Sequence, residues 1–113
     1  MSESNLYLAY TSCEDRHQAE LLARGLVSAR LAVCVNIGTP SVSIYPWKDA
    51  LETAEEVVLT IKTAKACIEG LKAYVAAHHP YEVPELLLVP VADGLESYMN
   101  WAQDWMRAAD HAD

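Results

Sequence analysis

The stretch His78-His79-Pro80-Tyr81-Glu82-Val83-Pro84-Glu85 marks the point at which a helix gives way to a strand. Proline has no backbone N–H and disfavours helical conformation in the residue before it, so we expect the helix to end near His79. Two imidazoles, a phenol and two carboxylates are then held on a stiffened connector. Imidazole and carboxylate are common ligands of divalent transition metals, so this connector is a candidate metal site.

The N-terminal third of the chain predicts a strand followed by a helix. Residues 6–11 form a short apolar run with tyrosines, which is typical of a strand. Ser12 and Asp15 have the spacing of a capping box and open the helix. Its apolar residues recur at helical spacing, namely Ala19, Leu22, Ala23 and Leu26.

The next segment predicts an interrupted extended region. Residues 32–37 are rich in β-branched side chains and favour a second strand. Gly38-Thr39-Pro40 interrupts this strand, and residues 42–47 resume extended structure. The polar and acidic residues 48–54 have the composition of a connecting turn.

The remaining half predicts two more strands and two more helices. Residues 56–63 form the third main strand, with one apolar face made by Val57, Leu59 and Ile61. Residues 64–78 are helical, residues 85–91 form the fourth strand, and residues 95–108 form a last helix.

The order of these elements is βαββαβ plus a C-terminal helix, which is the ferredoxin-like α+β plan with an antiparallel sheet. Both helices then cover one face of the sheet. The strands are nevertheless apolar on both faces, as in Val33-Cys34-Val35, Val57-Val58-Leu59 and Leu86-Leu87-Leu88-Val89. A half-solvated sheet alternates apolar and polar residues, so we expect another copy of the chain to cover the second face.

The composition indicates a single domain without a membrane span. Its 113 residues fit one domain over residues 1–113, with a core at about 6–106 and flexible ends at 1–5 and 109–113. No apolar stretch approaches the roughly 18 residues that a spanning helix needs. The first five residues lack the basic and apolar segments of a secretory signal, so we expect a cytoplasmic protein.

Charge and motifs exclude several function classes. The net charge of −8 argues against nucleic-acid binding, which needs clustered Lys and Arg. Cys13, Cys34 and Cys67 form no CxxC pair, so we expect free thiols. The chain has no Ser-His-Asp order, Gly-rich phosphate loop or HExxH pattern, and we therefore predict that it is not an enzyme.

Outside the connector, four further residues are candidates for binding a ligand, namely Cys34, Tyr45, Trp47 and Lys62. Each has a structural alternative: Cys34 as a small core residue, the two aromatics as core or interface residues, and Lys62 as the end of a strand. The paired histidines can likewise be helix-terminal residues. In a ferredoxin-like sheet the third strand ends near the connector, so we expect Lys62, His79 and Glu82 to converge on a small anionic or metal-bound ligand.

Five stretches in order carry a resemblance to a known family: Ala32-Val33-Cys34-Val35-Asn36-Ile37, Ser43-Ile44-Tyr45 with Trp47, residues 56–63, His79-Pro80-Tyr81-Glu82-Val83-Pro84-Glu85, and Tyr98-Met99-Asn100-Trp101. Together, over about residues 6–106, they resemble the CutA1 family of divalent-cation tolerance proteins. The most specific of them is the string that begins at His79.

The resemblance implies a homotrimer of ferredoxin-like subunits, similar in architecture to the PII signalling proteins. It also implies a link to tolerance of copper and other divalent ions. Metal binding in the family is associated with paired histidines, here His78 and His79, and with a cysteine near the end of the first strand. Thr11 stands in that cysteine's place, and Cys13 is the nearest thiol.

Two functions follow as expectations. In the first, the chain binds Cu²⁺ or another divalent metal through His78, His79 and Cys13, needs no organic cofactor, and has itself and the metal ion as partners. In the second, it is a PII-like sensor or interaction module that holds a small anionic ligand in clefts between subunits. The ligand-binding residues are then Cys34, Tyr45, Trp47, Lys62, His79, Tyr81 and Glu82.

Overall fold

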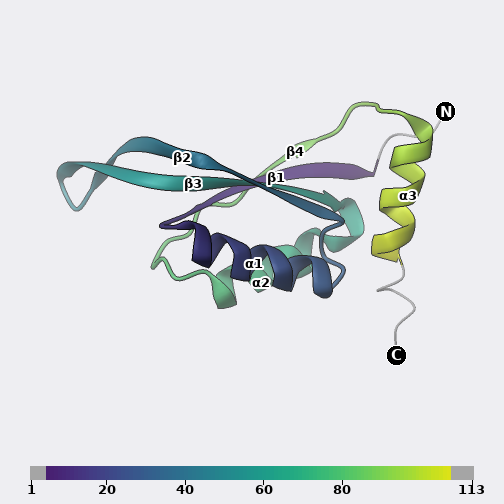
Figure 1. Cartoon of the computed structure of the whole chain (residues 1–113), viewed down its shortest axis with the longest axis horizontal. Coiled ribbons are helices and arrows are strands. Elements are labelled where there is room, and N and C mark those ends of the chain that lie inside the picture. Colours follow the sequence, from purple (N-terminus) through teal and green to yellow (C-terminus); the bar gives the residue numbers. More distant parts are fainter. Residues whose placement is uncertain (1–4, 108–113) are drawn as a thin grey trace.

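The computed structural model describes residues 5–107 and has an α+β architecture (Figure 1). The elements are β1 (Leu6–Cys13), α1 (Arg16–Ser28), β2 (Cys34–Trp47), β3 (Ala50–Ala64), a 3₁₀ turn (Lys65–Cys67), α2 (Ile68–His78), β4 (Leu87–Pro90) and α3 (Glu96–Arg107). The four strands form one antiparallel sheet in the order β2-β3-β1-β4. The predicted ferredoxin-like plan is confirmed; the ends predicted to be flexible lie almost wholly outside the described residues.

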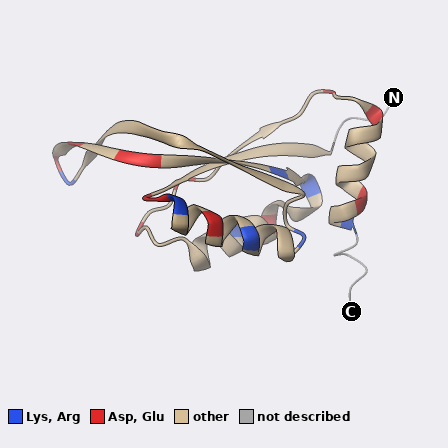
Figure 2. Ribbon diagram, in the orientation of Figure 1, with Lys and Arg blue, Asp and Glu red and all other residues tan. Residues whose placement is uncertain are grey.

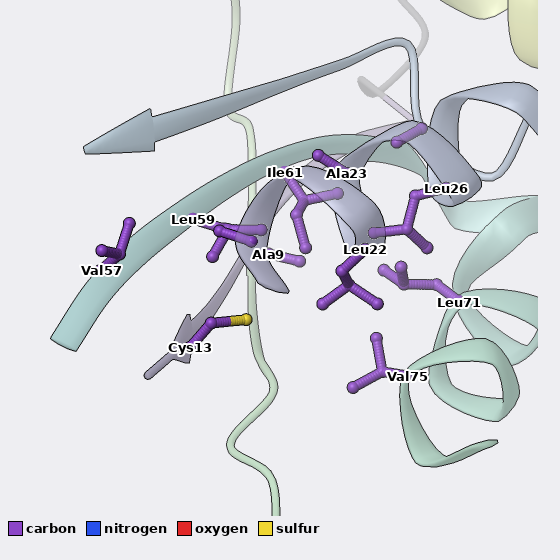
Figure 3. Close-up of a cluster of buried hydrophobic side chains, with 12 residues drawn as sticks. Ala9, Cys13, Leu22, Ala23, Leu26, Val57, Leu59, Ile61, Leu71 and Val75 are labelled. Atoms are coloured by element: carbon purple, nitrogen blue, oxygen red, sulfur yellow. The ribbon is translucent and has the colours of Figure 1, made fainter. Parts of the chain in front are cut away.

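The main core lies between the sheet and helices α1 and α2, which lie on the same face (Figures 1 and 3). Alternate residues of β3 point into this core, as the sequence pattern predicts: Val57, Leu59 and Ile61. The two helices meet them with apolar residues at helical spacing, including Leu22, Leu26, Leu71 and Val75. Burial of this face is the main stabilising contribution to the subunit.

Helix α3 packs on a second, smaller cluster at one end of the sheet, where Ala102 and Met106 are buried. Arg30 holds the helix in place from the turn after α1. Its guanidinium lies 3.6 Å from the centroid of the Trp105 ring and donates a 3.0 Å hydrogen bond to the Trp105 carbonyl. Arg30 has a φ of 59°, and this left-handed backbone conformation turns the chain from α1 toward β2.

The hairpin of β2 and β3 is longer than the sequence indicated. Its turn is only Lys48-Asp49, with φ values of 51° and 68°, and β3 begins directly afterwards at Ala50. Positive φ at both central residues suits a two-residue hairpin turn, because its twist matches that of the strands. The prediction of residues 48–54 as a connecting turn was therefore wrong. Residues 50–54 are paired in β3, and they are polar because the hairpin is exposed to solvent. The predicted interruption at 38–40 is a register shift between Ile37 and Pro40 within β2.

Three other boundaries differ by a few residues. Asp15 is itself the N-cap of α1 and accepts a 2.9 Å hydrogen bond from the Gln18 N–H, whereas Ser12 still belongs to β1. β4 is shorter than predicted, at Leu87–Pro90. The helix stop was predicted correctly, because α2 ends at His78 and the next residue is extended.

The described residues leave the hairpin and one sheet face without a cover. The β2–β3 hairpin reaches beyond the helices (Figure 1), and the Cα radius of gyration is 15.1 Å, against about 13 Å for a compact domain of this length. On the face away from the helices, Val58, Leu87 and Val89 are exposed. None of the helices in the described part of the chain has the length and apolar character of a membrane span.

Replacing Leu26 by Ala is expected to lower the free energy of unfolding by about 2–5 kcal/mol, because the side chain is fully buried between sheet and helices. Leu21→Ala removes the same atoms from the same helix at a position that is 59% exposed, so its effect should stay within about 0.5 kcal/mol. Chemical denaturation measures both. Equal losses would contradict the described core.

Candidate functional site

The connector after α2 crosses the end of β1 and is fixed there by His79. The His79 side chain is buried, and its Nε2 lies 2.7 Å from the Ser12 carbonyl oxygen. Its Nδ1 lies 3.1 Å from the backbone nitrogen of Tyr81. A carbonyl only accepts and an N–H only donates, so the ring is neutral with its proton on Nε2. Both ring nitrogens are therefore engaged within the chain.

Cys13 lies beside this ring, with its Sγ 3.9 Å from His79 Nε2. The thiol is fully buried at the end of β1 (Figure 3). Burial, with smaller contributions from Asp15 and Glu56, raises the pKa of Cys13 to about 11. Since metals bind the thiolate, Cys13 is a weak ligand near neutral pH. Thr11, two residues earlier, is equally buried and faces the same core.

His78 points in a different direction from its neighbour. It is exposed on the last turn of α2, where its ring stacks on Tyr74 at a centroid distance of 4.0 Å. Its Nδ1 donates a 3.0 Å hydrogen bond to the Tyr74 carbonyl, so the nitrogen that can accept a metal is Nε2. His78 is thus available to a metal in a way that His79 and Cys13 are not.

The three residues predicted to bind metal do not form one site in a single subunit. Within residues 5–107, no three His, Cys, Asp or Glu side chains converge closely enough to hold a metal ion. His78, His79 and Cys13 therefore do not form a preformed metal centre. To bind a metal, His79 would first have to break its hydrogen bonds and Cys13 would have to lose its proton.

A buried carboxylate that the sequence did not reveal ties the connector to β3. Glu56 is 9% exposed, and its Oε2 accepts a 2.6 Å hydrogen bond from the Tyr81 hydroxyl and a 3.4 Å bond from the Ser12 hydroxyl. Burial, followed by the bond to Glu56, raises the pKa of Tyr81. No local signal marks Glu56, since its partner lies 25 residues away in sequence.

The connector and the hairpin together line an open cavity of about 610 Å³. Four of the predicted ligand-binding residues line it: Tyr45 and Trp47 from β2, and Tyr81 and Glu82 from the connector. The lining also contains six carboxylates, from Glu14, Glu52, Glu55, Glu56, Glu82 and Glu85. No Lys, Arg or His among the described residues lines it. Figure 2 shows acidic segments along the hairpin and in the turn just before α1.

Cys34 and Lys62 lie elsewhere. They are cross-strand partners on β2 and β3, and Lys62 also pairs with Leu8 near the opposite end of β1. The Lys62 Nζ is 5.7 Å from the centroid of the Tyr98 ring in α3. The structure therefore does not bring Lys62 together with His79 and Glu82 within one subunit. The cavity is acidic, which disfavours the anionic ligand of the second expected function.

The sheet order and the two helices on one face define a ferredoxin-like α+β protein with an extended hairpin. Residues 7–105 match the family described as CutA1 divalent ion tolerance protein. The chain belongs to this family.

Similar proteins come from distant organisms. The chain is 42% identical over 100 residues to Protein CutA homolog from Xenopus laevis, covering 88% of this chain and 66% of the relative. It is 33% identical over 100 residues to "Protein CutA, chloroplastic" from Arabidopsis thaliana, covering 88% and 55%. The crystal structure of CutA from Xylella fastidiosa has a TM-score of 0.88 and 37% identity, covering 91% of this chain and 99% of that one. The chain thus spans about half to two thirds of these two curated relatives.

Thiol labelling tests the described burial. At pH 8, a Cys13 thiol with a pKa of about 11 is ionised in only about one molecule in a thousand. Cys67 is also buried, whereas Cys34 is partly exposed. We expect a single fast-reacting thiol with an aromatic disulfide reagent, and we expect the Cys34→Ser variant to lose that fast phase. Fast labelling of Cys13, located by peptide mass spectrometry, would contradict the arrangement at the end of β1.

Proposed function

We propose that the chain is a homotrimeric divalent-ion tolerance protein that binds copper or a similar metal and catalyses no reaction. The observation that carries the proposal is the family match over residues 7–105. The buried Cys13 thiol and the fully bonded His79 ring argue against catalysis by these two residues, because neither is placed as a nucleophile or base. The free thiols of the described residues support a reducing compartment such as the cytoplasm.

Assembly is supported by the uncovered surfaces. The sheet face that bears Val58, Leu87 and Val89 is apolar and exposed, and the outer edge of β2 has no partner strand within residues 5–107. Such surfaces are typical of interfaces between copies. A trimer accounts for both, because each hairpin reaches beyond its own subunit to a neighbour.

Leu87→Glu is expected to dissociate the trimer, since it places a charge on the exposed apolar face, at the edge strand β4. Leu21→Glu is the matched control: Leu21 is 59% exposed and Leu87 61%, but Leu21 lies on α1 away from the sheet. Sedimentation equilibrium at micromolar concentration distinguishes the species. A parent protein that stays monomeric would refute the proposed assembly.

Metal binding is assigned first to His78. Its Nε2 is a ready imidazole ligand, and copper has the highest affinity of the common divalent metals for such nitrogen sites. His79 and Cys13 join this site only after their bonds at the end of β1 are broken. We therefore expect His78 to govern affinity and His79 to govern stability.

Calorimetry with tag-free protein separates these roles. His78→Ala should weaken Cu²⁺ binding at least tenfold. His79→Gln should leave the affinity nearly unchanged but lower the melting temperature, because the Ser12 carbonyl and Tyr81 N–H lose their partner. Unchanged affinity in His78→Ala would show that His78 is not a metal ligand.

A further inference from the structure

We propose that the tip of the β2–β3 hairpin of one copy packs on helix α3 of the next copy, with Glu55 of the first paired to Lys62 of the second. The contact belongs to the trimer proposed above and depends on it. The hairpin tip and α3 lie at opposite ends of the subunit, whose longest extent is 48 Å (Figure 1). A contact between them therefore joins two copies.

One face of the hairpin tip is apolar and uncovered, and we call it the tip face. Val42 and Ile44 on β2 and Leu51 on β3 share this face, because alternate residues and directly opposed residues of a paired ribbon point the same way. All three side chains are exposed. Glu55 lies on the same face, since it is the cross-strand partner of Val42. The tip face is thus an apolar strip with a carboxylate at its base.

Helix α3 and the residue before it carry a second apolar strip, which we call the α3 strip. Leu95, Tyr98 and Trp101 follow one another at intervals of three residues, so they are neighbours on the helix surface. All three are exposed, and the rings of Tyr98 and Trp101 lie 5.7 Å apart. Tyrosine and tryptophan that are exposed together are typical of the centre of a protein interface.

Lys62 places a positive charge beside the α3 strip. Its Nζ lies 5.7 Å from the centroid of the Tyr98 ring, and its cross-strand partners Leu8 and Cys34 leave it among apolar neighbours. Within residues 5–107, no salt bridge joins Lys62 or Glu55 to a partner. Each of the two surfaces therefore has an apolar strip and one unpaired charge, and the two charges are opposite.

The two surfaces are complementary. Leu95 is 79% exposed and Leu51 78%, which makes them the most exposed large apolar side chains of the described residues, and each lies on one of the two surfaces. Docking covers both strips. It also pairs Lys62 with Glu55 as they leave water, whereas burying either charge alone would be costly. Because the two surfaces differ, the contact is head-to-tail, and three such contacts close a ring.

Charge exchange on the full chain tests the pairing, with sedimentation equilibrium over a dilution series as the measurement. Glu55→Lys or Lys62→Glu alone should raise the dissociation constant of the assembly at least tenfold, and Glu55→Lys/Lys62→Glu should recover most of that loss. Glu52→Lys is the matched control, because Glu52 is also exposed but lies on the opposite face of the hairpin. It should change the constant less than threefold. A double variant no better than the single ones, or an equal effect of Glu52→Lys, would overturn the pairing.

Cross-linking tests the contact without altering either charge. In a Cys34→Ser background, Leu51→Cys/Trp101→Cys should give covalent trimers with a short bismaleimide, and each single-cysteine variant should stay monomeric on a denaturing gel. Covalent dimers from a single-cysteine variant would mean that like surfaces meet, and would overturn the head-to-tail contact. A trimeric protein that gives no cross-link would overturn this contact alone, whereas a parent that sediments as a monomer would overturn the trimer as well.

Discussion

The neutral His79 ring is the contact on which the candidate site depends. It joins the connector to a strand 67 residues earlier by donating to the Ser12 carbonyl, and it receives the Tyr81 N–H on its other nitrogen. Because both nitrogens are engaged, the ring has one orientation and one tautomer. That orientation ends α2 at a fixed place, covers the Cys13 thiol, and brings the Tyr81 hydroxyl within reach of Glu56. This contact and the Tyr81–Glu56 hydrogen bond together hold the connector as the second wall of the acidic cavity.

The sheet imposes the other main constraint. Its helix-facing side is covered by α1 and α2, and within residues 5–107 its opposite side has no such cover. The same register that points Val57, Leu59 and Ile61 inward points Val58 outward, because successive side chains of a strand alternate. A strand with apolar residues on both sides therefore packs on the helices with one side and leaves the other side apolar and exposed.

The sequence predicted those features of the fold that depend on a pattern of neighbouring residues. The apolar spacing of α1, the alternation in β3 and the helix stop before Pro80 each arise within a few residues, and each was confirmed. The extent of the hairpin was missed because residues such as Glu52 and Glu55 are polar in an exposed ribbon for the same reason that they would be polar in a loop. The separation of Lys62 from His79 and the bond between Tyr81 and Glu56 depend on strand register over long distances, which no short pattern specifies.

The position of β1 in the middle of the sheet has a kinetic consequence. β2 and β3 are joined by a two-residue turn, so the entropy cost of closing the loop between them is small. Pairing of β1 with β3 and with β4 joins segments that are on the order of fifty residues or more apart, and the entropy of closing such loops makes these contacts slow to form. The hairpin can therefore pair before the rest of the sheet does. Its Val42, Ile44 and Leu51 stay exposed in the completed fold, so insertion of β1 does not protect the ribbon from pairing with another molecule.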